Sequence, residues 1–155
     1  MNRRMRVFAA ALVLLAAGSV LLAQSNPFVG SWTLNVAKSK FVPGPAPQSA
    51  TRTWDASGMV MVNGVNAAGK ATSYGYTINA DGKEYPTMGA IPNTADKITS
   101  KKIDANSYEA TFLKEGKEVE KTSFKLSDGG KTLTIHAIGT SPSGPFDNLQ
   151  VWEKK

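Results

Sequence analysis

The 155-residue sequence contains no cysteine and a single histidine, His136. The absence of cysteine excludes disulfide bonds, thiolate metal sites and cysteine nucleophiles. With one histidine, a metal site would need scattered carboxylates as its other ligands, and a serine–histidine–aspartate triad would have to use that one residue. No nucleophile motif accompanies it. We therefore expect no metal, no cofactor and no covalent catalysis.

The chain also lacks a charged stretch of one sign. Lysines and acidic residues are interspersed from 97 to 131, which is typical of a solvated surface and not of a nucleic-acid-binding stripe. Pairs of glycine and lysine recur, but the glycine-spaced motif of a phosphate-binding loop does not precede them. We expect neither nucleic-acid binding nor nucleotide chemistry.

The first 23 residues have the composition of a secretory signal peptide. Three arginines precede an apolar stretch over residues 7–23, which ends on the small residue Ala23. We expect cleavage after Ala23 and a periplasmic or secreted protein. An uncleaved anchor is the alternative, although the stretch is marginal against the roughly 20 apolar residues that a span needs. A lipid anchor would need a cysteine where this chain has Gln24.

Cleavage would leave residues 24–155, the size of one domain with one core. It would remove three arginines and no acidic residue, so that the formal net charge falls from +6 to +3. We expect this domain to be a monomer with no stable membrane anchor.

Four glycine turns, each followed by lysine, separate segments rich in β-branched and aromatic residues. The turns are Gly69-Lys70, Gly82-Lys83, Gly116-Lys117 and Gly129-Gly130-Lys131. Glycine between two alternating segments is typical of a β-hairpin. We predict an all-β fold, an antiparallel up-and-down meander of 8–10 strands closed into a barrel. The expected strands start at Gly30 and cover 49–56, 59–65, 71–79, 97–104, 107–114, 118–126, 131–140 and 148–154, with a loop over 141–146.

The segment Gly30-Ser31-Trp32, at the start of such a meander, resembles the glycine-x-tryptophan opening of lipocalins. The stretch from Asn26 through Lys38-Ser39-Lys40-Phe41 to Pro43-Gly44-Pro45 resembles a group of exported bacterial lipocalin-like proteins of no established activity. The resemblance extends over most of the chain after the signal segment. It implies a calycin-type barrel outside the cytoplasm.

The C-terminal segment, residues 149–154, is similar to the last strand of fatty-acid-binding proteins. Those proteins usually place an arginine and a tyrosine two residues apart there, to hold a carboxylate. The matching positions here are Gln150 and Trp152. The change removes the charge, so fatty-acid binding does not follow from the similarity.

Arg52 is the only arginine after the signal segment, and it shares a strand face with Trp54. If this face points inward, the guanidinium must be paired or must meet an anionic ligand, because an unpaired buried charge is costly. One hypothesis is an anchor for a carboxylate or phosphate, with Trp54 against the ligand body. The alternative is an arginine stacked on a tryptophan that closes one end of the barrel.

Aromatic residues at alternating positions indicate either a ligand pocket or a filled core. For a pocket, we predict the wall residues Trp54, Tyr74, Tyr76, Phe112 and Trp152, with Arg52 and Gln150 as polar anchors. The last strand has two possible orientations. If it turned Leu149 and Val151 inward, Arg52 would be the only polar anchor.

The carboxylates predict no enzyme. Glu118 and Glu120 are expected on the outer side of a strand, and no carboxylate pair in an apolar recess is evident. The alternation of residues 132–136 places His136 toward solvent, although one histidine is enough for a haem-binding barrel.

The sequence therefore favours an exported barrel that binds a small apolar or amphipathic molecule in its lumen. The alternative is a protein-binding module, such as a periplasmic inhibitor of a protease or of lysozyme. It would act through the irregular segment 88–95 and the proline loop 43–47 while the interior stays packed.

Overall fold

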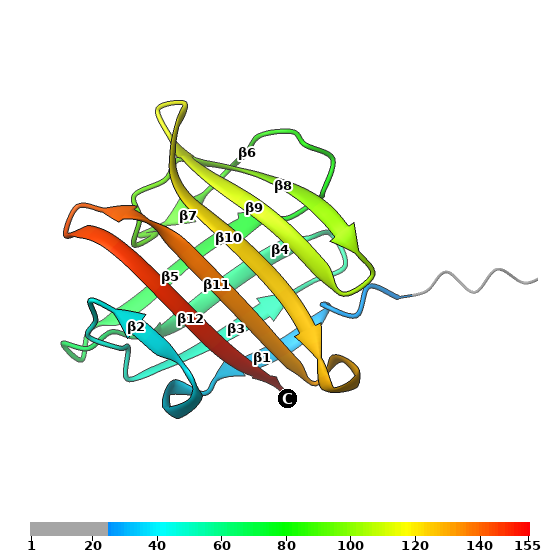
Figure 1. The fold of residues 1–155 in the computed structure, drawn as a ribbon, viewed down its shortest axis with the longest axis horizontal. Helices are drawn as coiled ribbons and strands as arrows, with labels where there is room; N and C mark the ends of the chain where they lie inside the picture. Colours follow the sequence, from blue (N-terminus) through cyan, green and yellow to red (C-terminus); the bar gives the residue numbers. More distant parts are fainter. Residues whose placement is uncertain (1–24) are drawn as a thin grey trace, which may run out of the picture.

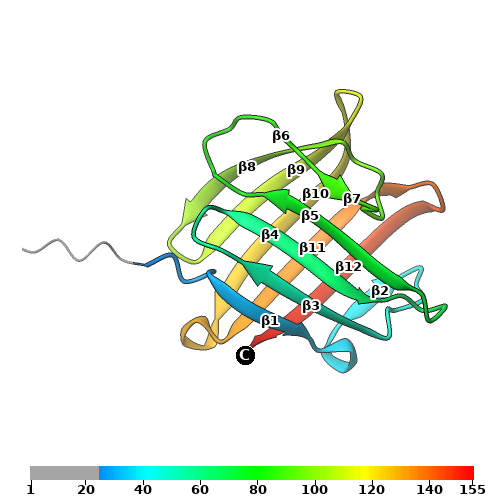
Figure 2. The ribbon, with the colours of Figure 1, turned by 180° about the vertical axis from the view of Figure 1, so that it is seen from behind.

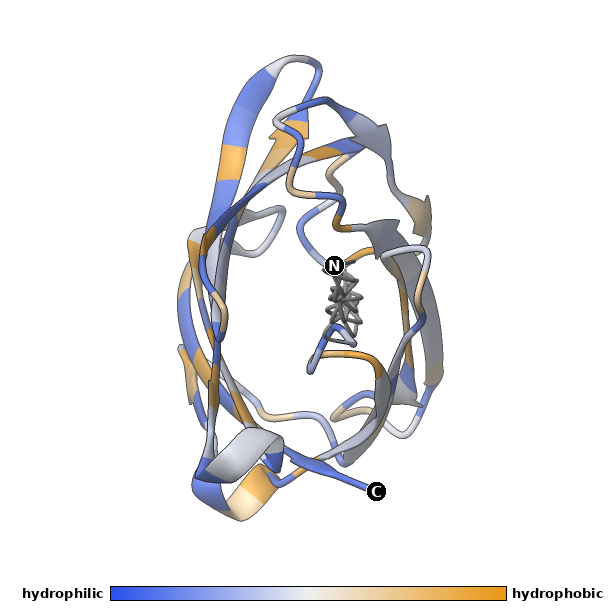
Figure 3. Cartoon of the chain, turned by 90° about the vertical axis from the view of Figure 1, so that its right-hand side faces the viewer, coloured by the Kyte–Doolittle hydropathy of each residue, from blue (hydrophilic) through white to orange (hydrophobic). Residues whose placement is uncertain are grey.

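A computed structural model describes residues 25–155, so the expected signal segment lies outside the described residues. The described chain is all-β and forms one antiparallel sheet that nearly closes into a barrel. Strands β8 to β12 form one wall and β1, β3, β4 and β5 form the opposite wall (Figures 1 and 2). Seen end-on, the strands run around the molecule as an oval ring (Figure 3). The predicted fold class is confirmed.

Apart from the short strands β2, β6 and β7, neighbouring strands of the ring follow one another in chain order, as in a meander. The strands are β1 (Gly30–Leu34), β2 (Lys40–Val42), β3 (Ser49–Trp54), β4 (Met59–Val65), β5 (Ala71–Thr77), β6 (Tyr85–Pro86), β7 (Met88–Gly89), β8 (Lys97–Asp104), β9 (Ser107–Lys114), β10 (Lys117–Ser127), β11 (Thr132–Ser141) and β12 (Gly144–Lys154). Two short 3₁₀ turns, η1 (Val36–Lys38) and η2 (Asp128–Gly130), interrupt them. No helix within residues 25–155 is long and apolar enough to cross a membrane.

The number of strands exceeds the predicted 8–10 because two strand positions are divided. Strands β1 and β2 both pair with β12, on either side of η1. Strands β6 and β7 are two parts of one stretch, residues 85–89. Its first part pairs with β8 and its second part with β5. This stretch therefore joins the two ends of the sheet.

Three of the four glycine–lysine turns form the predicted hairpins. Gly69 and Gly116 have φ of 78° and 76° between paired strands, a conformation that glycine adopts without strain. The turn at Gly82 differs from the prediction, because β5 pairs with β7 and not with the strand that directly follows the turn. The Gly82 amide donates instead to the carbonyl of Ser100, on β8.

The predicted loop over 141–146 is wrong. Strand β11 continues to Ser141 and β12 begins at Gly144, so that only two residues connect a long hairpin. Pro145 is tolerated in β12 because it lies close to the end of the strand and is exposed. The extension turns Phe146 toward the barrel interior, where it lines a cavity.

Candidate functional site

One half of the barrel interior is filled with aromatic side chains. Phe28, which precedes β1, is fully buried with its ring centroid 4.9 Å from that of Trp54 and 4.8 Å from that of Tyr108. The ring of Phe124 lies 5.9 Å from Trp54, edge to face. Trp54, predicted as a wall residue of a pocket, therefore packs in the filled half. For this half, the filled-core alternative describes the structure.

The other half contains a cavity of about 90 Å³. Five of the seven predicted site residues line it: Arg52, Tyr74, Tyr76, Phe112 and Gln150. The sequence analysis did not identify the remaining lining residues as site residues: Ile91, Pro92, Asn93, Glu120, Thr122, Ile135, Ala137 and Phe146. The cavity is thus surrounded by polar groups from several strands and from the segment between β7 and β8.

Arg52 is 3% exposed, and its guanidinium lies between aromatic rings. One Nη donates a hydrogen bond to the hydroxyl of Tyr76, and Cζ lies 4.7 Å from the ring centroid of Trp152. Nε has no hydrogen-bond partner in the part of the chain that the structure describes, nor does any carboxylate there lie within 4.0 Å of the guanidinium. The arginine does stack on a tryptophan, but on Trp152 of the last strand and not on Trp54.

The orientation of the last strand is now established. Trp152 is 1% exposed and faces inward, whereas Leu149 is 39% exposed and faces outward. The indole Nε1 of Trp152 donates to Oε1 of Gln150 at 3.1 Å, which orients the Gln150 amide at the cavity wall. Of the two predicted residues of β12, Trp152 therefore contacts Arg52 and Gln150 lines the cavity.

The expectation that Glu120 faces outward beside Glu118 is wrong. A β-bulge between the two residues inserts one extra residue into β10, so that they no longer share a face. Glu120 is directed inward, in phase with Thr122 and Phe124, while Glu118 is exposed. The cavity consequently contains a carboxyl group.

Two side chains donate hydrogen bonds to the Glu120 carboxyl group. Nδ2 of Asn93 donates to Oε2 at 2.6 Å, and the hydroxyl of Thr122 donates to Oε1. Burial raises the pKa of Glu120, against the opposing effects of these two hydrogen bonds and of the more distant Arg52. The site thus holds a carboxyl group that retains its proton to a higher pH than an exposed glutamate does.

The tyrosines of β5 are neutral. Desolvation raises the pKa of Tyr74 and of Tyr76, and the charge of Arg52 offsets this effect only in part. The two rings stack with centroids 6.5 Å apart, and Tyr76 meets Phe112 edge to face at 5.2 Å. Both tyrosines line the cavity, together with the other polar side chains named above.

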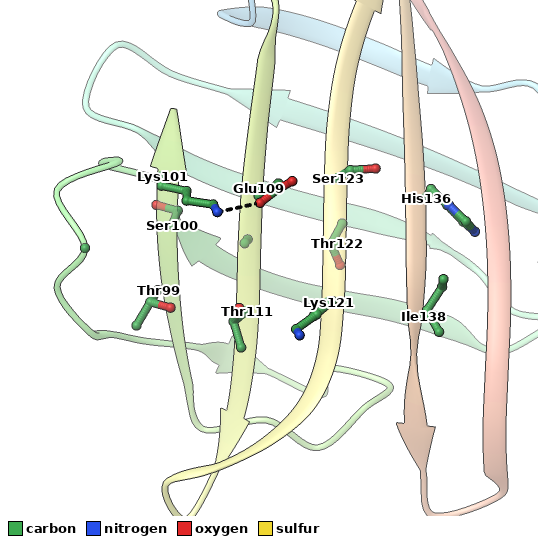
Figure 4. Close-up of a pocket in the computed structure, with 12 residues that line it drawn as sticks. Thr99, Ser100, Lys101, Glu109, Thr111, Lys121, Thr122, Ser123, His136 and Ile138 are labelled. Carbon is green, nitrogen blue, oxygen red and sulfur yellow. Dashed lines mark ion pairs between the residues drawn. The ribbon is translucent and has the colours of Figure 1, made fainter. Parts of the chain in front are cut away.

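A larger depression, of about 510 Å³, lies on the outer face of β8 to β11 (Figure 4). Lys101 and Glu109 form an ion pair of 2.8 Å at its side, near the threonines Thr99 and Thr111. His136 lies at the opposite side and is bonded to Asp147 at 2.7 Å. The outward orientation of His136 is thus confirmed. Because the ionisable side chains here are paired and exposed to solvent, we consider the interior cavity the stronger candidate site.

No group of three or more histidine, aspartate or glutamate side chains in residues 25–155 is arranged to hold a metal ion. Comparisons with protein-family models and with curated proteins found no match. The functional assignment therefore rests on the geometry of the barrel interior.

Proposed function

We propose that the protein is an exported barrel that binds a small amphipathic molecule with an anionic group in the open half of its interior. Arg52 would bind the anionic group, and Gln150 would accept or donate a further hydrogen bond. The signal-like composition of residues 1–23 supports the proposal of export.

The observation that carries this proposal is the state of Arg52. A buried guanidinium with no carboxylate in contact is costly, and aromatic rings and one hydroxyl compensate its desolvation only in part. A bound carboxylate would place an opposite charge in contact with the guanidinium and accept from its donors. Since the cavity of about 90 Å³ is smaller than the roughly 300–1,000 Å³ of most ligand pockets, the part of the molecule that it holds must be small.

The test compares native and denatured mass spectra of the protein purified after export. We expect an additional small mass that disappears on denaturation, and a denatured mass that begins at Gln24. In the variant Arg52→Met/Tyr76→Phe, which keeps the side-chain volumes and leaves no unpaired hydroxyl, we expect the additional mass to be absent. Because a buried ionic group is often replaced by apolar residues at no cost, the variant should unfold at the same or a higher temperature.

A wild-type protein that stays bare after incubation with a bacterial extract of lipids and aromatic metabolites would overturn the proposal. A variant that loses stability markedly would instead favour the structural role of Arg52 as a closing residue. The protein-binding alternative would then remain. Its segment 88–95 contains the buried residues Ile91, Asn93 and Ala95, so that part of the segment packs into the molecule and is not free to contact a partner.

A further inference from the structure

Arg52 and Glu120 are the only charged or acidic side chains that line the interior cavity in the described chain. They come from opposite walls, β3 and β10, and they make no ion pair within 4.0 Å. The other polar groups at the cavity are the neutral side chains of Tyr74, Tyr76, Asn93, Thr122 and Gln150. A charged group that enters the cavity therefore interacts electrostatically mainly with Arg52 and Glu120.

We infer that the cavity takes up a small carboxylic acid as an anion together with one proton, the anion on Arg52 and the proton on Glu120. This inference deepens the proposed function and rests on it. It assigns Glu120 as a binding residue that couples anion binding to proton uptake.

The charge balance of the cavity supports this coupling. With Glu120 ionised, Arg52 and Glu120 sum to zero, and an entering carboxylate would leave a net negative charge in a desolvated space. With Glu120 protonated, the carboxylate and Arg52 sum to zero instead. Because an unbalanced charge is costly at low dielectric, the anion and the proton favour each other's binding.

The surroundings of Glu120 act on its protonation in both directions. Burial already favours the protonated form, while the donors Asn93 and Thr122 stabilise the ionised form. A nearby anion adds a further contribution in the direction of protonation. By linkage, an anion that raises the proton affinity of Glu120 binds more tightly as the pH falls.

The three tryptophan indole N–H groups provide a reporter within the molecule. Trp152 donates to Gln150 beside the cavity, whereas Trp32 donates to the carbonyl of Phe28 and Trp54 packs in the filled half. In a titration with sodium propionate followed by ¹H–¹⁵N NMR, we expect the Trp152 signal to shift and the other two to stay in place. Propionamide, which has the same shape and no charge, should cause no shift.

Between pH 8 and pH 6, where propionate remains an anion, we expect its affinity for the wild-type protein to rise by up to about tenfold per pH unit, the limit for one linked proton. Calorimetry in buffers of different ionisation enthalpy should show uptake of a proton. The variant Glu120→Gln, which is permanently neutral, should bind propionate more tightly than the wild type does at pH 8, and with the same affinity at pH 8 and at pH 6. Glu118→Gln, an exposed carboxylate of the same strand, is the matched control and should behave as wild type.

The outcomes separate the two proposals. If neither propionate nor the bacterial extract yields a bound molecule in the wild-type protein, the proposed function itself fails. If propionate binds through Arg52 with no pH dependence, or if Glu120→Gln binds it no better than the wild type at pH 8, the proton coupling is overturned and the proposed function stands.

Discussion

At the scale of single residues, the inward position of Glu120 gives the protein a pH-dependent stability that an exposed glutamate would not. Its pKa is raised in the folded state by burial, so the folded state binds this proton more tightly than the unfolded state. Protonated Glu120 therefore contributes to the free energy of unfolding in full below its pKa in the unfolded chain. This contribution is lost as the pH rises through its higher pKa in the folded state. We expect the variant Glu120→Gln, whose side chain does not titrate, to lack this decrease of stability with rising pH.

Urea denaturation at pH 4 and pH 7 measures the effect. The free energy of unfolding of the wild type, relative to that of Glu120→Gln, should decrease between the two pH values. Glu118→Gln should leave the decrease unchanged. An equal pH dependence in the wild type and in Glu120→Gln would contradict the raised pKa.

The sequence contained a signal for Glu120 that its lysine-rich neighbours concealed. Glu120 alternates in phase with Phe124 and Leu126, both of which are buried, and this phase alone indicates an inward side chain. The partners of the carboxyl group were less accessible to prediction. Asn93 is 27 residues away and comes from the irregular segment, so only the folded chain brings the two together.

At the scale of elements, the bulge in β10 is matched by a glycine in the next strand. A Cβ atom at Gly139 would lie 2.2 Å from the carbonyl oxygen of Val119 and 2.8 Å from Cα of Glu120. Both are backbone atoms, so the bulge would have to move. We expect Gly139→Ala to cost about 1–3 kcal/mol, as overpacking commonly does.

Thr140→Ala, at the next and exposed position, is the control and should change stability little. Urea denaturation measures both variants. The added methyl group would meet the backbone of Val119 and Glu120. We therefore expect Gly139→Ala to shift the backbone ¹H–¹⁵N signals of residues 118–121 more than the indole signal of Trp152. A stable Gly139→Ala variant with unmoved signals in β10 would show that the bulge does not depend on this glycine.

Elements joined by local turns were predictable, and those joined across the ring were not. The hairpins at Gly69 and Gly116 depend on residues close in sequence, and they were predicted correctly. The stretch 85–89 pairs with two strands at once, β5 on one side and β8 on the other. That arrangement depends on how the whole sheet curves, which alternation within a segment does not report.

At the scale of the whole molecule, the interior divides into a filled half that stabilises the barrel and an open half that carries the candidate site. The seven site residues predicted from the sequence face inward, because alternation defines a strand face well. Alternation does not say where along the barrel each residue lies. For that reason the sequence predicts Trp54 as a cavity residue, whereas in the structure its ring packs against Phe28.

This division predicts that stability and binding are separable. Phe28 is fully buried between Trp54 and Tyr108, and its carbonyl oxygen accepts from the Trp32 indole at 3.0 Å. Phe28→Ala removes a large buried ring from the filled half, which typically costs about 3–5 kcal/mol. The cavity lining does not include Phe28, so propionate affinity at 10 °C should stay within about twofold of the wild type, since sites without shared contacts act nearly independently. Thermal unfolding and the NMR titration together test this expectation. A loss of affinity in proportion to the loss of stability would mean that the two halves form one cooperative unit, and ligand binding would then be a property of the whole barrel.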